Sequence, residues 1–253
     1  MRSDSLSKYM NCENIELFFK PRYHLLTKRI SSVEVSLLLA NKEMPTFKEI
    51  EFLSSYEKAK IVGSFELWML HETCKWQKNW IESHVNYVPL VINFTFDILN
   101  NPYLIYDIVL CLKEYKLPEN AIRIAINTRG LLQNTMGLNK CLSYVKANQV
   151  PIILNGNSYD SSLPLLLDKM KCDGIKIDSV FLNKIQFSKE DRMVLEEIIH
   201  ACRNMTIEFS CNGIDSLVEL EKLEALGCDH GQGDFLSPLL SVAQMAKLLL
   251  NSL

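Results

Sequence analysis

The sequence predicts one α/β domain that closes into a (β/α)8 barrel, and three observations support this fold class. Short apolar runs alternate with helix-period segments from residue 87 onward, as in a parallel sheet with helical crossovers. Eight strand candidates follow one another without a linker or low-complexity stretch. The 253 residues match the roughly 250 that such a barrel needs. We expect a short N-terminal extension over 1–14 and a single barrel domain over 15–253.

The first two strand candidates, 15–20 and 33–39, are connected differently from the others. A charged stretch around 27–32 joins them, and it is too short for the crossover that parallel strands require. We therefore expect this pair to be antiparallel. Apolar residues at 61, 65, 68, 69, 76 and 80 then predict a helix with a broad buried face, which includes Trp76 and Trp80.

The remaining elements alternate along the chain. We expect strands over 87–94, 121–126, 150–154, 172–178, 205–209 and 228–232, and helices over 98–115, 131–148, 163–170, 190–203, 216–226 and 242–250. Ser216 is a favourable N-cap residue for one of these helices. Parallel strands of a barrel end on one face, so polar residues at their carboxyl ends are the candidate site.

Composition narrows the classes of partner and compartment. The net charge of −3 gives no field suited to direct binding of nucleic acid. The first fourteen residues do not read as a signal peptide, and no apolar run of about 18 residues occurs, so we expect a cytoplasmic protein without membrane contact. The eight dispersed cysteines are expected to be buried and reduced, and the five histidines to be surface or cap residues.

Seven strand-end segments, in this order, resemble the EAL domain family, which hydrolyses the bacterial second messenger cyclic di-GMP. They are Glu34-Val35-Ser36, Val91-Ile92-Asn93, Ile124 to Asn127, Leu154-Asn155-Gly156, Ile175 to Asp178, Cys211 to Asp215, and Gly227 to Gly233. The resemblance covers about residues 15 to 250. It implies a modified TIM barrel of the EAL type with an antiparallel first strand pair, in agreement with the short first connection.

The resemblance also implies a ring of metal-binding and substrate-binding residues, of which only part is kept. The positions that match, or nearly match, are Glu34, Asn93, Lys176, Asp215 and Gln232. Acidic positions are lost at Ala125, Leu154, Asn155 and Asn212, and substrate positions are replaced by Lys20 and Leu38. Hydrolysis of a phosphodiester in this family needs two divalent ions held by carboxylates. We therefore expect no metal, no cofactor and no phosphodiesterase activity.

A structural role is an alternative for the residues that are kept. Lys176 and Gln232 could bond strand-end carbonyls at the barrel mouth, and Glu34 could form a salt bridge with Lys176. Both alternatives remain open from the sequence.

Four shorter matches resemble the enterobacterial YdiV type of degenerate EAL protein: Glu16 to Phe19, Glu72-Thr73-Cys74, Ala125-Ile126-Asn127 and Gly213-Ile214-Asp215. That resemblance implies a protein partner, the flagellar master regulator FlhDC through its FlhD subunit. The leading hypothesis is a catalytically inactive, protein-binding regulator of flagellar or virulence gene expression. The alternative is a cyclic di-GMP receptor that does not hydrolyse its ligand, although the lost substrate positions disfavour tight binding. A residual phosphodiesterase is the third hypothesis.

Overall fold

The computed structural model describes residues 15–39, 62–94, 102–127, 142–156, 172–178 and 189–252. Its elements, in chain order, are β1 (Ile15–His24), β2 (Ile30–Leu39), α3 (Val62–Glu82), β3 (Leu90–Phe94), α4 (Pro102–Tyr115), β4 (Ile122–Asn127), β5 (Ile152–Gly156), β6 (Gly174–Asp178), α8 (Lys189–Asn204), β7 (Glu208–Asn212), α9 (Leu217–Leu226), β8 (His230–Gly231), β9 (Leu240–Ser241) and α10 (Val242–Asn251). The expected extension over 1–14 and the expected helix over 163–170 lie outside these residues.

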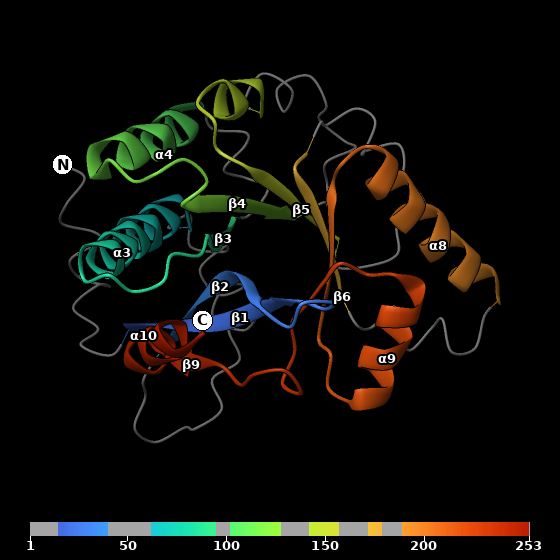
Figure 1. Ribbon diagram of the computed structural model, residues 1–253. Helices are drawn as coiled ribbons and strands as arrows, with labels where there is room; N and C mark the ends of the chain where they lie inside the picture. The colour runs from blue at the N-terminus through green and yellow to red at the C-terminus, as the bar shows by residue number, and fades with distance from the viewer. Residues whose placement is uncertain are drawn as a thin grey trace.

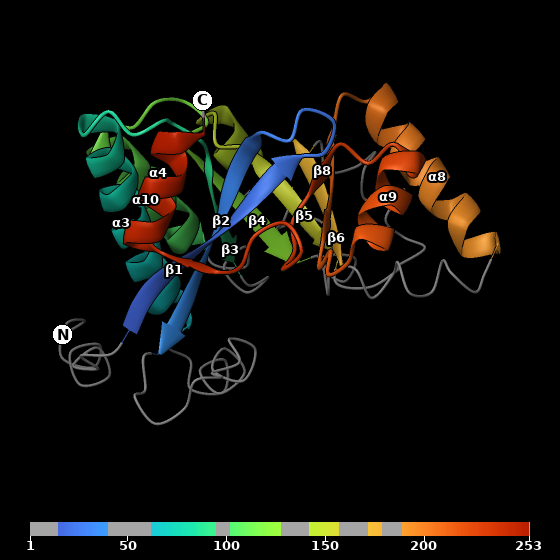
Figure 2. The same cartoon turned by 60° about the horizontal axis from the view of Figure 1, so that its bottom comes forward.

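The strands form one closed sheet. They are hydrogen-bonded in the order β2-β3-β4-β5-β6-β7-β8-β1, and β1 also pairs with β2, which closes the barrel. Neighbouring strands from β2 to β8 are parallel, whereas β1 is antiparallel to both β2 and β8. The predicted barrel with an antiparallel first pair is therefore confirmed. Helices α3, α4 and α10 lie on one side of it, and α8 and α9 on the other (Figures 1 and 2).

Helix boundaries follow local capping signals. The Ser216 hydroxyl accepts a hydrogen bond from the Glu219 N–H, as predicted, and α9 ends at Gly227 with φ 77°. Helix α10 begins with a capping box in which Ser241 and Gln244 satisfy each other's backbone N–H groups. These caps fix the two helices that flank the last strands of the barrel.

Two predictions about strands need correction. The strand expected over 205–209 begins instead at Glu208, because Met205 and Thr206 complete the end of α8 and Thr206 adopts φ 57°. The sequence also gave no sign of β9, a two-residue strand that pairs with β1 through Phe18 and Phe19.

The core surrounds the barrel and agrees with the apolar pattern. Trp80 is buried and its ring lies 5.1 Å from that of Phe19, while Trp76 is partly buried against the same core. Six cysteines are described, and all are free and buried: Cys74, Cys111, Cys172, Cys202, Cys211 and Cys228. For these six the expectation is confirmed, whereas Cys12 and Cys141 lie outside the described residues. Among the helices described, none is long and apolar enough to cross a membrane.

Candidate functional site

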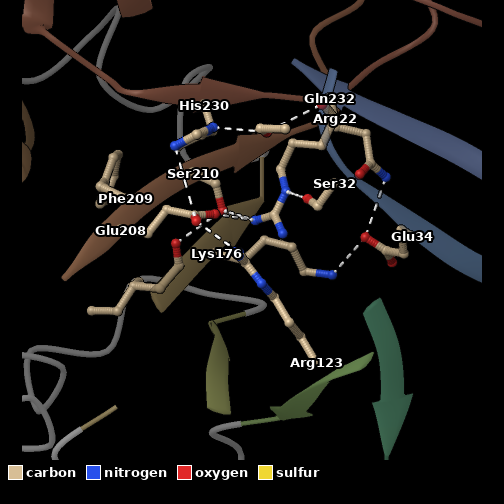
Figure 3. Close-up of polar contacts among 12 residues, drawn as sticks. Arg22, Ser32, Glu34, Arg123, Lys176, Glu208, Phe209, Ser210, His230 and Gln232 are labelled. Carbon is tan, nitrogen blue, oxygen red and sulfur yellow. Dashed lines mark hydrogen bonds and ion pairs between the residues drawn. The ribbon is translucent and has the colours of Figure 1, made fainter. Parts of the chain in front are cut away.

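Five polar side chains meet inside the barrel, and we call them the ring cluster: Glu34, Asn93, Asn155, Lys176 and Gln232. They come from β2, β3, β5, β6 and the residue that follows β8. Figure 3 shows Lys176, from β6, and Gln232, which follows β8, converging on Glu34. The structure thus brings together four of the five matching positions that the sequence indicated, together with one replaced position, Asn155.

Hydrogen bonds occupy both carboxylate oxygens of Glu34. The Lys176 Nζ donates to Glu34 Oε2 over 2.9 Å, and the Gln232 Nε2 donates to the same oxygen over 3.2 Å. The Asn93 Nδ2 donates to Glu34 Oε1 over 2.7 Å. Asn93 Oδ1 in turn accepts from Lys176 over 3.1 Å and from Asn155 over 3.4 Å. The proposed alternative, a salt bridge between Glu34 and Lys176, is therefore present.

This ion pair is shielded from water. The side chain of Lys176 is 2% exposed and that of Glu34 is 14% exposed. Burial raises the pKa of Glu34, but the charge of Lys176 and the hydrogen bonds from Lys176 and Asn93 outweigh it, so the pKa lies below the ordinary 4.5. Glu34 is consequently ionised and neutralised by Lys176 at neutral pH.

Two of the replaced acidic positions are apolar, and the structure places them differently. Ala125 is fully buried and packs with Val91 and Ile153 in a small cluster of its own. Leu154 lies in the main hydrophobic core, because alternation along β5 directs it to the face opposite Asn155. Only Asn155 of the pair Leu154 and Asn155 therefore joins the ring cluster. Ala125 leaves an apolar contact where the resemblance implied a glutamate.

Two further sequence-indicated residues, Lys20 and Asp215, lie at the edge of the site. Lys20 forms an ion pair with Asp234, so its charge is already compensated. Asp215 is exposed beyond β7, and its Oδ1 accepts a hydrogen bond from the Asp234 N–H over 3.4 Å. Asn212 ends β7. The side chain of Leu38 lies outside the described residues.

A second polar group, which sequence reasoning missed, fills the barrel at the amino ends of the parallel strands. We call it the basal cluster, and it consists of Arg22, Ser32, Arg123, Glu208, Ser210 and His230 (Figure 3). The Arg22 side chain is 2% exposed. It donates to Ser32 Oγ over 2.7 Å and to Ser210 Oγ over 2.9 Å. Its Nη1 lies 3.1 Å from Glu208 Oε1.

Glu208 connects the two arginines. Arg123 Nη1 donates to Glu208 Oε2 over 2.8 Å, opposite the contact with Arg22. Burial raises the pKa of Glu208, but Arg22, His230 and Arg123 lower it below its ordinary value. A carboxylate between two guanidinium groups thus joins β1, β4 and β7.

His230 differs from the expectation that it would be a surface or cap residue. Its side chain is 13% exposed, and its Nδ1 lies 2.8 Å from the Ser31 hydroxyl. Its Nε2 lies 4.0 Å from Glu208. Burial lowers the pKa of His230, and Arg22 and His24 lower it further against the opposing effect of Glu208. His230 is therefore neutral at pH 7.

No group of three or more histidine, cysteine, aspartate or glutamate side chains is arranged to hold a metal ion within the parts of the chain that the structure describes. The ring cluster contributes one carboxylate and three neutral amides besides its lysine. Its geometry suits a self-contained hydrogen-bond network in which the lysine ammonium contacts the carboxylate.

Comparison with known proteins shows a match to one domain family and to several curated relatives. The sequence model of the EAL domain family matches residues 3–239 of this chain. The signaling protein YkoW of Bacillus subtilis is 22% identical over 222 residues, which are 87% of this chain and 28% of YkoW. The chain spans about a third of the length of the curated relatives it matches.

Solved structures share the fold at low sequence identity. The EAL enzyme Bd1971, in a form with cAMP and cyclic di-GMP bound, has a TM-score of 0.86 at 20% identity and covers 97% of this chain and 67% of its own. The FimX EAL domain of Pseudomonas aeruginosa, bound to cyclic di-GMP, has a TM-score of 0.81 at 18% identity, with coverage of 94% and 96%.

Proposed function

Because this chain belongs to the EAL domain family, we propose that it uses the family's barrel without its hydrolytic chemistry, as a protein-binding regulator of gene expression. A flagellar or virulence activator such as FlhDC is the proposed target. The observation that carries this proposal is the ring cluster, in which Lys176 and two amides occupy the carboxylate of Glu34.

The five side chains of the ring cluster, taken by themselves, do not fit two divalent ions. Hard dications prefer several carboxylate oxygens, and Mg²⁺ tolerates little departure from octahedral geometry. Glu34 is the one carboxylate of the ring cluster, and Asn155 and Ala125 stand where the family resemblance implied acids. Removal of a residue that only supports a ligand typically costs about 10- to 100-fold in metal affinity or activity. Here the carboxylates that would themselves bind the metal are replaced, and a larger loss is expected. This supports the proposal that the protein does not hydrolyse cyclic di-GMP.

A turnover assay tests the catalytic half of the proposal. Purified protein would be incubated with cyclic di-GMP and Mg²⁺ or Mn²⁺, with the MucR protein of Pseudomonas aeruginosa, named a bifunctional diguanylate cyclase/cyclic di-GMP phosphodiesterase, as the positive control. We expect no product above the protein-free blank. Metal-dependent turnover that disappears in a Glu34→Gln variant would contradict the proposal.

A reconstituted binding assay tests the regulatory half. We expect the protein to bind purified FlhDC and to release it from a target promoter fragment in a mobility-shift assay. Binding to the isolated FlhD subunit would identify the contact. If FlhDC neither binds the protein nor leaves the DNA, FlhDC is the wrong target.

A non-hydrolysing cyclic di-GMP receptor is the second candidate, favoured by the bound ligand in the FimX EAL domain of similar fold. The pairing of Lys20 with Asp234 counts against it, since a phosphate would have to compete with that carboxylate. Calorimetric titration with cyclic di-GMP separates the two candidates. Micromolar binding without turnover would support the receptor, and absence of heat would support the protein-binding regulator.

A further inference from the structure

Two buried amide oxygens near the carboxyl end of the barrel have no hydrogen-bond donor among the described residues: Asn212 Oδ1 and Gln232 Oε1. Gln232 is 7% exposed, and its amide nitrogen donates to Glu34, so its oxygen points away from that carboxylate. A buried acceptor without a donor costs folding free energy. These oxygens therefore indicate a ligand that brings hydrogen-bond donors.

The two residues occupy neighbouring positions, since Asn212 ends β7 and Gln232 directly follows β8. Cys211 pairs with Gly231, and the Gln232 N–H donates to the Cys211 carbonyl over 2.9 Å, which continues the parallel ladder. Asn212 follows Ser210 by two residues, and Ser210 contacts Arg22 inside the barrel. Alternation along β7 therefore directs Asn212 to the same inner face.

Aspartates occupy positions close to these acceptors in the strand register and in the loops that follow. Asp178 is opposite Asn212 in the register of β6 and β7. Asp215 lies in the segment that follows β7, where its Oδ1 accepts a hydrogen bond from the Asp234 N–H, whereas the charge of Asp234 is balanced by Lys20. The lysines of this region are already engaged, since Lys20 pairs with Asp234 and Lys176 with Glu34. A cation is therefore favoured over an anion or an apolar group.

We propose that Asn212 and Gln232 form a binding site for an organic cation, the guanidinium or ammonium group of an arginine or lysine side chain. A guanidinium carries five N–H donors in a planar fork, which matches two neighbouring amide oxygens. A dication would instead require more carboxylate ligands. This inference deepens the proposed function, on which it rests, by naming the chemical group that the protein partner inserts into the barrel mouth.

The test uses N-acetyl-arginine amide as the probe, followed through the side-chain amide NMR signals of Asn212 and Gln232. N-acetyl-citrulline amide is the matched neutral probe, because its urea group replaces the guanidinium at nearly constant shape. Asn212→Asp turns a neutral acceptor into a charged one and should tighten arginine binding about tenfold, whereas Asn212→Leu should weaken it by about the same factor. Asn251→Leu, an exposed site on α10, is the control and should change nothing.

The outcomes separate the site from its alternatives. Tighter binding of arginine within an alanine-rich peptide than of the free amide would indicate a protein partner as the source, and equal binding would indicate a small amine or guanidine. Equal binding of the citrulline and arginine probes would overturn the proposed site, as would unchanged arginine binding by a folded Asn212→Leu variant. In either case water would be the partner of these oxygens. Displacement of arginine by Mg²⁺ at equal concentration would overturn it in favour of a metal ion.

Failure of this inference is distinct from failure of the proposed function. If FlhDC binds but arginine does not, only the site is wrong. If arginine binds at Asn212 and FlhDC does not bind, the site holds and the proposed partner is wrong.

Discussion

Replacement of Lys176 by methionine should reveal how strongly the ring cluster depends on its ion pair. The substitution keeps an unbranched side chain one atom shorter and removes the charge that neutralises Glu34 at 2.9 Å. Both side chains are largely buried, at 2% and 14% exposure. Breaking a buried pair from one side typically costs about 3–5 kcal/mol, because the remaining charge has no partner. For a chain of this size that corresponds to a fall in Tm of about 10 °C.

Thermal and urea unfolding at pH 7 would measure the loss. The double variant Glu34→Gln/Lys176→Met should recover most of it, since removing both charges leaves no buried ion uncompensated. Lys75→Met is the matched control, because Lys75 is 57% exposed and its pair with Glu72, at 3.6 Å, should contribute at most about 0.5 kcal/mol.

The loss of stability in the Lys176→Met variant should disappear in acid. In the native protein the pKa of Glu34 lies below the unfolded value, so its stabilising contribution is present above pH 4.5 and is lost as the pH falls through the folded pKa. In Lys176→Met the pKa of Glu34 in the folded state should lie above its unfolded value, so protonation of Glu34 removes the cost of its unpaired buried charge. The two stabilities should therefore converge below about pH 4.5. A deficit under about 1 kcal/mol at pH 7, or one that does not depend on pH, would refute this account of the ion pair.

Three further predictions concern other parts of the barrel. Arg22→Met should lower the free energy of unfolding by about 3 kcal/mol in urea, because two buried hydroxyls and Glu208 lose a donor, and a loss below about 1 kcal/mol would contradict this. His230→Gln should flatten the fall in Tm below pH 6.5. Burial lowers the pKa of His230 in the folded state, so its contribution to stability is full above pH 6.5 and is lost on acidification. An unchanged profile of Tm against pH would assign that fall to other groups. Gly233→Ala should cost about 1–3 kcal/mol by thermal unfolding, because its Cβ would lie 2.0 Å from the Ile214 carbonyl oxygen, and a neutral effect would show that this loop shifts freely.

Periodicity and connection length were enough to predict the barrel, because both are local properties of the chain. The short link between β1 and β2 excluded a crossover, and the structure shows that pair antiparallel. The start of β7 was not predictable in the same way. Met205 and Ile207 are apolar like strand residues, but they lie in the turn that follows α8, where the Ile207 N–H donates back to Cys202 O. Hydrophobicity alone does not separate a helix end from a strand start.

The basal cluster could not be assembled from sequence, because Arg22, Arg123 and Glu208 lie far apart in the chain and match no motif. Closure of the barrel alone places them together. One local signal was nevertheless available, since each is charged at a strand position. The opposite directions of the Leu154 and Asn155 side chains could also be predicted from the sequence. Adjacent residues of a strand face opposite sides, so only one of the two could join a ring inside the barrel.

The charges of the ring cluster balance one another. Glu34 carries one negative charge, Lys176 carries one positive charge, and Asn93, Asn155 and Gln232 are neutral, so the five groups sum to zero. Had residues 125, 155 and 212 been acidic, as the family resemblance implied, the same space would hold three additional carboxylates around one lysine. Such a site would repel itself until divalent ions entered it. An alanine and two amides at these positions therefore lower the negative charge of this space, and the ring cluster joins the strands through neutral amides and one ion pair.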